Sequence, residues 1–394
     1  MRAVGIFLVA VLTAGVVRAS GFGLYEMSTA GHALGGAVVG RAVDASANYY
    51  NPATLADITN ITVTAGFVTQ HPRTRIKVDG APSTRMDSGL YALPHVNVAA
   101  PLPKGFVFGL GIYPEYGLGT SYERHWALAN SSRETTVMSI TVNPNVAYAI
   151  TEDWSIAAGL RFLYFDFEQY SDPMPGKIGH HLFGNNGMKD FGWQVGTRYR
   201  LRDDFAVGAV YRSATTVGVE GRSVTSGLQH TRNHAETEMR LPQSITAGFN
   251  WDMTRTLHLG AALMWTQWSS IGTLDFNLGG KHTPCKLEWE DTFRVSVAPS
   301  WDFAEDWTWM GSYAFENDCC GGQDSTMLPA ANRHLLATGV IWRYSANLEF
   351  SLSYGLIIMD GQTSQATGTD GRLHRYEPHR GLSHAVGLSV TYRF

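Results

Sequence analysis

The chain has 394 residues, with 30 lysines and arginines against 34 aspartates and glutamates, which gives a formal charge of −4. Charged residues make up only 16% and aromatic residues 12%, a composition that excludes a disordered chain. The near-neutral charge excludes the basic surface of a nucleic-acid-binding protein, and the slightly negative mean hydropathy excludes a bundle of membrane-spanning helices.

The first segment is typical of a secretory signal. Met1 and Arg2 give a short positive start, residues 3–17 form an apolar run, and Val17-Arg18-Ala19 places small residues before a cleavage site. The apolar run is too short for a membrane-spanning helix. We therefore expect residues 1–19 to be removed during export; a buried N-terminal helix is the other reading.

Residues 20–59 are small and apolar, with several glycines in AGHALGGAVVG, and end in NYYNPATLADI. A free tail would not carry so many apolar groups in water. This segment therefore needs cover from the part of the chain that follows it.

From residue 60 onward, apolar residues alternate with small or polar ones at a period of two. In the last segment Leu382, Val386 and Leu388 alternate with Ser383 and Gly387, the pattern of a β-strand with two different faces. Such segments reach ten residues or more and carry aromatic residues at the ends of the apolar face, as transmembrane strands do. We predict 14 strands, at about residues 60–71, 90–100, 104–115, 134–150, 153–168, 187–201, 204–218, 236–251, 255–271, 286–303, 306–316, 333–343, 347–359 and 381–394.

The connections alternate between short turns, such as residues 101–105 and 303–307, and longer polar loops, such as residues 169–187 and 219–235. This matches the periplasmic turns and extracellular loops of outer-membrane barrels. We predict an all-β protein, a 14-stranded antiparallel transmembrane β-barrel over residues 60–394, in the outer membrane of a Gram-negative bacterium. A barrel this wide is not filled by its own side chains, so residues 20–59 are expected inside it as an N-terminal hatch; a periplasmic extension is the other reading.

The three cysteines, Cys285, Cys319 and Cys320, lack the C-x-x-C spacing of redox or metal motifs. In an exported protein a disulfide from Cys285 to either Cys319 or Cys320 is one reading, and the sequence does not choose between them. Because the chain carries no catalytic, nucleotide-binding or zinc motif, we expect no enzyme activity, no cofactor and no metal.

Several stretches together resemble the FadL/TodX/OmpP1 family of outer-membrane transporters of hydrophobic compounds. They include the start Gly21-Phe22-Gly23-Leu24-Tyr25-Glu26-Met27-Ser28, the triplet Asn51-Pro52-Ala53 and YGLGTSYERHW at residues 116–126. The end Tyr392-Arg393-Phe394 is similar to the signal read by the barrel assembly machinery, with Phe394 last. The resemblance covers essentially the whole mature chain.

The resemblance implies a monomeric barrel, closed by its hatch, that takes up hydrophobic molecules passively. Long-chain fatty acids are the expected ligands; uptake of aromatic hydrocarbons is the alternative within the family, and a surface or adhesive protein is the alternative outside it. The resemblance further implies capture between the extracellular loops, a pocket near the hatch, and a sideways exit into outer-membrane lipid at a kink in the third strand.

Three sets of residues are the expected site. Apolar hatch residues and inward residues of the fifth strand suit a hydrophobic ligand, and an inward arginine suits a carboxylate; this set is Phe22, Leu24, Tyr25, Met27, Arg161, Leu163 and Phe165. Ordinary packing, and pairing of the arginine with an acid, are the other readings. Asn51, Pro52 and Ala53 are expected to fix a turn of the hatch.

In the third strand Gly109, Gly111 and Pro114 are expected to interrupt strand pairing; close packing of small residues against the hatch is the other reading. After the fifth strand, Asp166 and Glu168 stand where a base would be expected for a fatty acid. This leaves a neutral hydrophobic ligand open.

Overall fold

The computed structural model describes residues 21–87, 89–174, 177–227, 230–320, 326–328, 331–361, 363–378 and 381–394. The predicted signal, residues 1–19, lies outside the described residues. None of the helices in the described part of the chain is long and apolar enough to cross a membrane.

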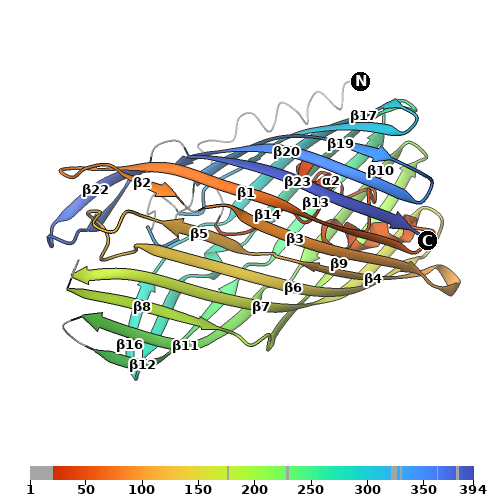
Figure 1. The fold of residues 1–394 in the computed structure, drawn as a ribbon. Coiled ribbons are helices and arrows are strands. Elements are labelled where there is room, and N and C mark those ends of the chain that lie inside the picture. Colours follow the sequence, from red (N-terminus) through yellow and green to blue (C-terminus); the bar gives the residue numbers. More distant parts are fainter. Residues whose placement is uncertain are drawn as a thin grey trace.

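The wall is one closed antiparallel β-barrel (Figure 1), and it confirms the predicted all-β fold with 14 strands. Each wall strand pairs with the next one, and the last returns to pair with β1. In order around the barrel the strands are β1 (Thr62–Val78), β3 (Tyr91–Pro101), β4 (Phe106–Tyr113), β6 (Glu134–Ala149), β7 (Trp154–Met174), β9 (Asp190–Arg202), β10 (Phe205–Arg212), β13 (Ser244–Asp252), β14 (Leu257–Thr266), β17 (Thr292–Ala304), β18 (Trp307–Glu316), β19 (Ala331–Arg343), β20 (Leu348–Gly361) and β23 (Gly381–Arg393).

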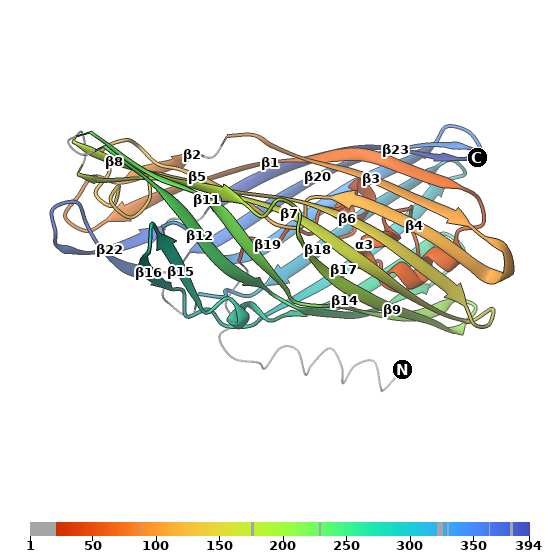
Figure 2. The ribbon, with the colours of Figure 1, turned by 90° about the horizontal axis from the view of Figure 1, so that it is seen from below.

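Further strands lengthen the barrel at the end opposite the short turns (Figure 2). They are β2 (Thr84–Asp87), β5 (Gly117–Ser121), β8 (Ile178–Asn185), β11 (Thr215–Gly227), β12 (Thr231–Leu241), β15 (Thr273–Leu278), β16 (Lys281–Lys286), β21 (Ser364–Thr367) and β22 (Leu373–Pro378). The prediction of loops at 169–187 and 219–235 is therefore wrong, because these stretches are mostly paired strands. Outside the membrane, a β-hairpin can carry polar side chains on both faces. Its composition then resembles that of a polar loop, so composition alone does not distinguish the two.

Two one-turn 3-10 helices adjoin the wall strands. The helix η2 (Pro103–Gly105) forms the turn between β3 and β4, and η3 (Trp268–Ser270) follows β14. The predicted strand over 255–271 therefore ends earlier than expected, at Thr266.

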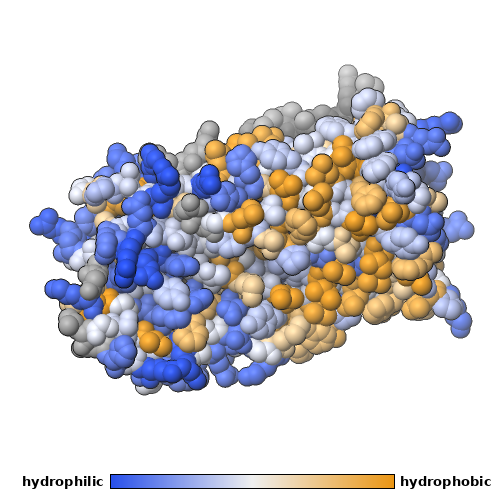
Figure 3. Space-filling view, in the orientation of Figure 1, coloured by the Kyte–Doolittle hydropathy of each residue, from blue (hydrophilic) through white to orange (hydrophobic). Residues whose placement is uncertain are grey.

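The wall carries apolar side chains on its outer face and small or polar side chains on its inner face, the reverse of a water-soluble protein. In β23, Leu382, Val386 and Leu388 are at least 40% exposed, whereas Ser383 and Thr391 are buried against the interior. Figure 3 shows an apolar band over the half of the barrel near the short turns, and a polar surface over the half with the added strands. Near the short turns the exposed side chains include an aromatic girdle, as at a membrane interface: Trp154, Tyr199, Trp301, Trp307, Trp342 and Tyr392.

Residues 21–58, here called the N-terminal segment, lie inside the barrel (Figure 1, red). Their helices are α2 (Thr29–Ala33), which packs on β19 and β20, α3 (Ala47–Tyr50), and the 3-10 helix η1 (Pro52–Asp57), which packs on β6, β7 and β9. The Ser28 hydroxyl accepts a hydrogen bond from the Gly31 N–H and so caps α2. This arrangement brings the N-terminal segment against most sides of the wall.

Candidate functional site

The third wall strand is interrupted between β4 and β5. Tyr113 pairs with Thr141 and Gly117 with Met138, so three residues of this strand stand opposite two of β6. The Ser139 hydroxyl accepts hydrogen bonds from the N–H groups of Glu115 and Tyr116, at 3.1 and 2.8 Å, and donates one to the Tyr116 carbonyl. The interruption is therefore a β-bulge whose backbone groups are satisfied by one side chain.

The bulge separates this strand from β3 on its other side. Pairing between β3 and β4 ends at Val96 and Ile112, and in the described chain β5 pairs with β6 and not with β3. Beside this gap His95 and Asn97 are buried, and their side-chain nitrogen and oxygen atoms find no hydrogen-bond partner among the described residues. Buried polar groups without partners are costly, so these two side chains keep unused hydrogen-bonding capacity beside the gap.

The structure separates the residues predicted for the third-strand kink. Pro114 is the first residue of the bulge, whereas pairing continues on both sides of Gly109 and Gly111. A Cβ atom at Gly109 would lie 2.1 Å from the Asn48 Oδ1 atom of the N-terminal segment, and one at Gly111 would lie 3.2 Å from the Asn48 Cβ. These two glycines therefore lie where the N-terminal segment packs closely against the wall.

The first residues of the N-terminal segment run beside the bulge. The Gly117 N–H donates to the Phe22 carbonyl (2.9 Å), and the Leu24 N–H donates to the Glu115 carbonyl (3.0 Å). From β19, the Arg333 guanidinium donates to the carbonyls of Gly21 and Gly23. The segment thus covers backbone groups that the interrupted strand leaves without a ladder partner.

Arg161, a predicted ligand-binding residue, forms an ion pair with Glu115 of the bulge. Its Nη2 atom lies 2.6 Å from the Glu115 Oε1 atom, and the two side chains are 2% and 7% exposed. The Thr141 hydroxyl donates to the Glu115 carboxylate, and Arg161 Nη1 donates to the Ser213 carbonyl. This buried ion pair holds the Glu115 side chain toward the barrel interior.

Three of the predicted apolar residues pack in one cluster, which also includes Tyr116 of the bulge. Phe22, Leu163 and Phe165 pack there, and the Phe22 ring lies 5.2 Å from the Trp268 ring and 6.0 Å from the Trp289 ring, centre to centre. Both tryptophans fall within the predicted strands 255–271 and 286–303, but the structure places them outside β14 and β17, so strand alternation does not give their inward side. We call this group the aromatic cluster.

Leu24 and Met27 lie elsewhere. They pack in a second apolar group formed largely by the N-terminal segment itself, together with Tyr49 and Tyr50. Both residues are buried, so the structure gives them contacts with protein on all sides.

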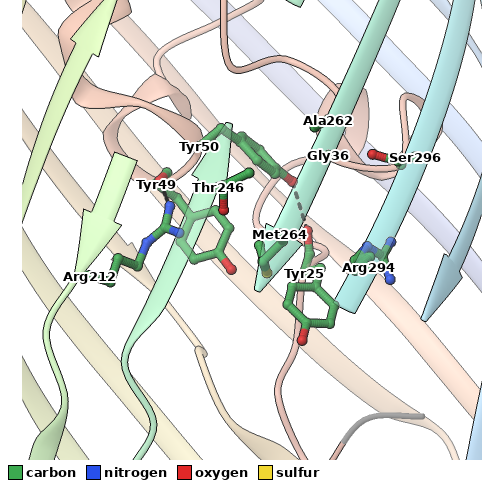
Figure 4. Close-up of a pocket in the computed structure, with 11 residues that line it drawn as sticks. Tyr25, Gly36, Tyr49, Tyr50, Arg212, Thr246, Ala262, Met264, Arg294 and Ser296 are labelled. Atoms are coloured by element: carbon green, nitrogen blue, oxygen red, sulfur yellow. Dashed lines mark hydrogen bonds between the residues drawn. The ribbon is translucent and has the colours of Figure 1, made fainter. Parts of the chain in front are cut away.

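Tyr25 lines a cavity between the N-terminal segment and the wall formed by β10, β13, β14 and β17 (Figure 4). The Tyr50 hydroxyl donates to the Tyr25 carbonyl (dashed line in Figure 4). The Tyr25 hydroxyl donates to the Glu316 carboxylate at 2.7 Å. The Arg294 guanidinium lies over the Tyr25 ring and 3.4 Å from Glu316. The lining also includes Gly35, Gly36, Tyr49, Arg212, Thr246, Ala262, Met264 and Ser296.

Arg212 is the distinctive group of this cavity. It is 3% exposed, and its guanidinium lies 4.2 Å over the Tyr49 ring and donates to the Tyr49 carbonyl. Its Nε atom and the neighbouring Thr246 hydroxyl find no hydrogen-bond partner among the described residues, and no described carboxylate lies within 4 Å of Arg212. Burial raises the pKa of Tyr49 to about 12, so its hydroxyl stays protonated.

Strand alternation over residues 204–218 could have identified Arg212. Ala206, Val210 and Arg212 share one face, and that face is inward. The missing signal was the cavity, which depends on how the N-terminal segment lies against the wall.

The triplet Asn51-Pro52-Ala53 begins η1. The Asn51 Oδ1 atom accepts a hydrogen bond from the Ala53 N–H, and its Nδ2 atom donates to the carbonyls of Val39 (2.7 Å) and Thr197 (3.0 Å). Pro52 occupies the first turn of η1, where its missing N–H is not needed. The triplet thus ties a turn of the N-terminal segment to β9.

Comparison with known proteins places this geometry in a family. Residues 10–394 match the model of the family described as outer membrane protein transport protein (OMPP1/FadL/TodX). The chain is 23% identical to the long-chain fatty acid transport protein of Escherichia coli O6:H1, over 95% of this chain and 94% of that protein. It is 22% identical to outer membrane protein P1 of Haemophilus influenzae, over 88% of this chain and 87% of that protein.

Solved structures share the fold. A Pseudomonas aeruginosa FadL homologue superposes with a TM-score of 0.85 at 16% identity, over 95% of this chain and all of that one. The Pseudomonas putida toluene transporter TodX superposes with a TM-score of 0.76 at 14% identity, over 94% and 99%. Since the family model spans nearly the whole sequence, the chain belongs to the OMPP1/FadL/TodX family of outer-membrane transporters of hydrophobic compounds, and it is a channel rather than an enzyme.

Proposed function

We propose that this protein takes up long-chain fatty acids by passive diffusion. The observation that carries the proposal is Arg212, a buried cation in the cavity with no acid beside it among the described residues. A buried charge without a counter-ion is expensive, and a ligand carboxylate would offset that cost through charge-assisted hydrogen bonds. The Thr246 hydroxyl offers one more donor at the same place.

The proposed route begins at the extracellular loops and passes the aromatic cluster, where the acyl chain replaces contacts between apolar side chains. Each methylene removed from water contributes about 0.8 kcal/mol, so an apolar path suits a fatty acid better than a water-filled pore. We place the hatch function in residues 20–59 and the exit at the bulge of Pro114, Glu115 and Tyr116, beside the unpartnered His95 and Asn97. The route needs no cofactor or energy-coupling partner.

The head-group part of the proposal is tested by comparing oleate with oleyl alcohol, which shares the chain but lacks the charge. With purified protein in detergent, Arg212→Gln should weaken oleate binding about tenfold or more, since a hydrogen bond to a charged group contributes about 1.5–3 kcal/mol, and leave oleyl alcohol unchanged. Arg200→Gln is the matched control, because Arg200 also sits in the wall but pairs with Asp153 near a short turn. Equal losses for both ligands would contradict the role of Arg212.

The exit is tested separately from the pocket. Deleting Tyr116 in a Pro114→Val background makes the strand pair residue for residue with β6 and should close the bulge. We expect oleate uptake by cells lacking their own transporter to fall to background while binding in detergent persists. Pro114→Val alone, which keeps the bulge, is the control. Full uptake by the deletion variant would exclude a lateral exit at this place.

Uptake of aromatic hydrocarbons is the second candidate, and the aromatic cluster favours it. Phe22, Trp268 and Trp289 present several rings at edge-to-face angles, an arrangement that also accommodates a small aromatic ligand. Toluene uptake that survives Arg212→Gln, with no oleate uptake in wild type, would support this candidate over the first.

A further inference from the structure

Beyond the transport route, the chain after β18 brings three metal-ligating groups together. One carboxylate oxygen of Asp318 and the Sγ atoms of Cys319 and Cys320 lie within 4.8 Å of one another. All three residues are at most 1% exposed. Because a zinc–sulfur bond is about 2.3 Å long, ligands around one ion stand about 4 Å apart, so a single ion fits between these atoms.

The backbone holds the three groups in place. The Cys320 N–H donates to the Asp318 Oδ1 atom at 2.7 Å, which fixes the carboxylate against the following turn. The Glu290 N–H donates to the Cys319 carbonyl at 2.6 Å and ties the same turn to the chain before β17. Ligands that are already positioned lose little freedom when they bind.

The two adjacent cysteines are poorly suited to an ordinary disulfide. Neighbouring Cα atoms are about 3.8 Å apart, below the usual disulfide range of about 4.4–6.8 Å. The sequence left open a bond from Cys285, but in the described structure all three cysteines carry thiols, and Cys285 packs at the border of the aromatic cluster. A dithiol is therefore the state to explain.

We propose that Asp318, Cys319 and Cys320 bind one thiophilic divalent metal ion of the zinc and cadmium type. Thiolates are soft ligands that select such ions, and the carboxylate supplies a third donor. As each metal–sulfur bond forms, its thiol releases a proton to solvent, so one ion replaces two protons without any redox step.

The metal site shares no ligand with the proposed head-group pocket or the proposed exit. Its cysteines share the aromatic cluster with Phe22 and Trp289, but neither Arg212 nor the bulge contributes a ligand. Metal binding and fatty-acid uptake can therefore be tested, and can fail, separately.

The experiment uses the full mature protein in detergent, fully reduced and freed of metal. Titration with Cd²⁺ should produce an ultraviolet thiolate-to-metal absorption that saturates at one ion per chain. Cys319→Ser and Cys320→Ser should each abolish it, and Asp318→Asn should weaken affinity about tenfold or more, as loss of a supporting carboxylate does elsewhere. Gel electrophoresis of heated and unheated samples checks folding, because a folded barrel changes its mobility when heating unfolds it. Each variant should show this change.

Cys285→Ser is the matched control, since it removes a thiol at the edge of the same cluster and should leave stoichiometry and affinity unchanged. An absorption that persists in Cys319→Ser, or that disappears in Cys285→Ser, would overturn the assignment. So would the lack of saturable binding when a thiol assay in denaturant counts all three cysteines as reduced.

Discussion

The buried ion pair at the bulge makes a sharp prediction. Replacing Arg161 with Met leaves the Glu115 carboxylate 7% exposed, with the Thr141 hydroxyl as its remaining side-chain donor. Removing one partner of a buried pair costs about 3–5 kcal/mol, whereas an exposed pair contributes at most about 1 kcal/mol. We therefore expect Arg161→Met to lower the free energy of unfolding by about 3–5 kcal/mol, measured by urea unfolding in lipid vesicles with tryptophan fluorescence.

A double-mutant cycle separates the pair from its surroundings. Glu115→Gln alone should also destabilise, because it leaves the Arg161 guanidinium buried, and combining the two changes should recover about 2 kcal/mol or more of the summed loss. If Arg161 instead serves a ligand carboxylate, Arg161→Met will lower oleate uptake, spare toluene uptake and leave unfolding within about 1 kcal/mol of wild type. That result would refute the structural role of the pair.

Three further predictions follow from burial and close packing. Gly109→Ala should destabilise the barrel by about 1–3 kcal/mol, whereas Gly218→Ala, at a site with nothing within 4 Å, should stay within about 0.5 kcal/mol in the same unfolding assay. Burial raises the pKa of Asp44 from its ordinary 3.8, so its ionisation costs stability as pH rises; Asp44→Asn should match wild type at pH 3 and exceed it at pH 7. Mass spectrometry of the exported protein should find Ser20 as first residue, and Ala19→Leu should leave the precursor uncleaved.

The barrel was predictable because its rule is local and repeated. Every wall strand must show apolar residues to lipid and small or polar ones to the interior, and this alternation is legible in one sequence. Closure then requires all backbone groups to pair within the wall. The hairpins beyond the membrane obey no such rule, and the prediction of a loop that includes residues 178–185 is wrong because these residues form β8.

The site was less predictable because its residues meet across the interior. Phe22 and Phe165 pack in one apolar group, but the contacts of Trp268 and Trp289 in that group depend on where the N-terminal segment lies. Alternation predicts that Arg161 points inward but does not predict its partner, because Glu115 points inward only through the bulge. Alternation along a strand thus predicts whether a side chain points inward or outward, but not which residue it contacts.

The bulge explains why a gap in the wall is tolerated at all. An interrupted strand in lipid exposes N–H and C=O groups that no water can satisfy, at several kcal/mol each. Here the Ser139 hydroxyl serves three of these groups, and the backbone of Phe22 and Leu24 serves two more. A ligand leaving through the proposed exit must therefore supply hydrogen bonds of its own or displace the start of the N-terminal segment. A fatty acid carries such groups and toluene does not, so the two ligands should differ most at this step, and Ser139→Ala should alter the uptake of each to a different extent.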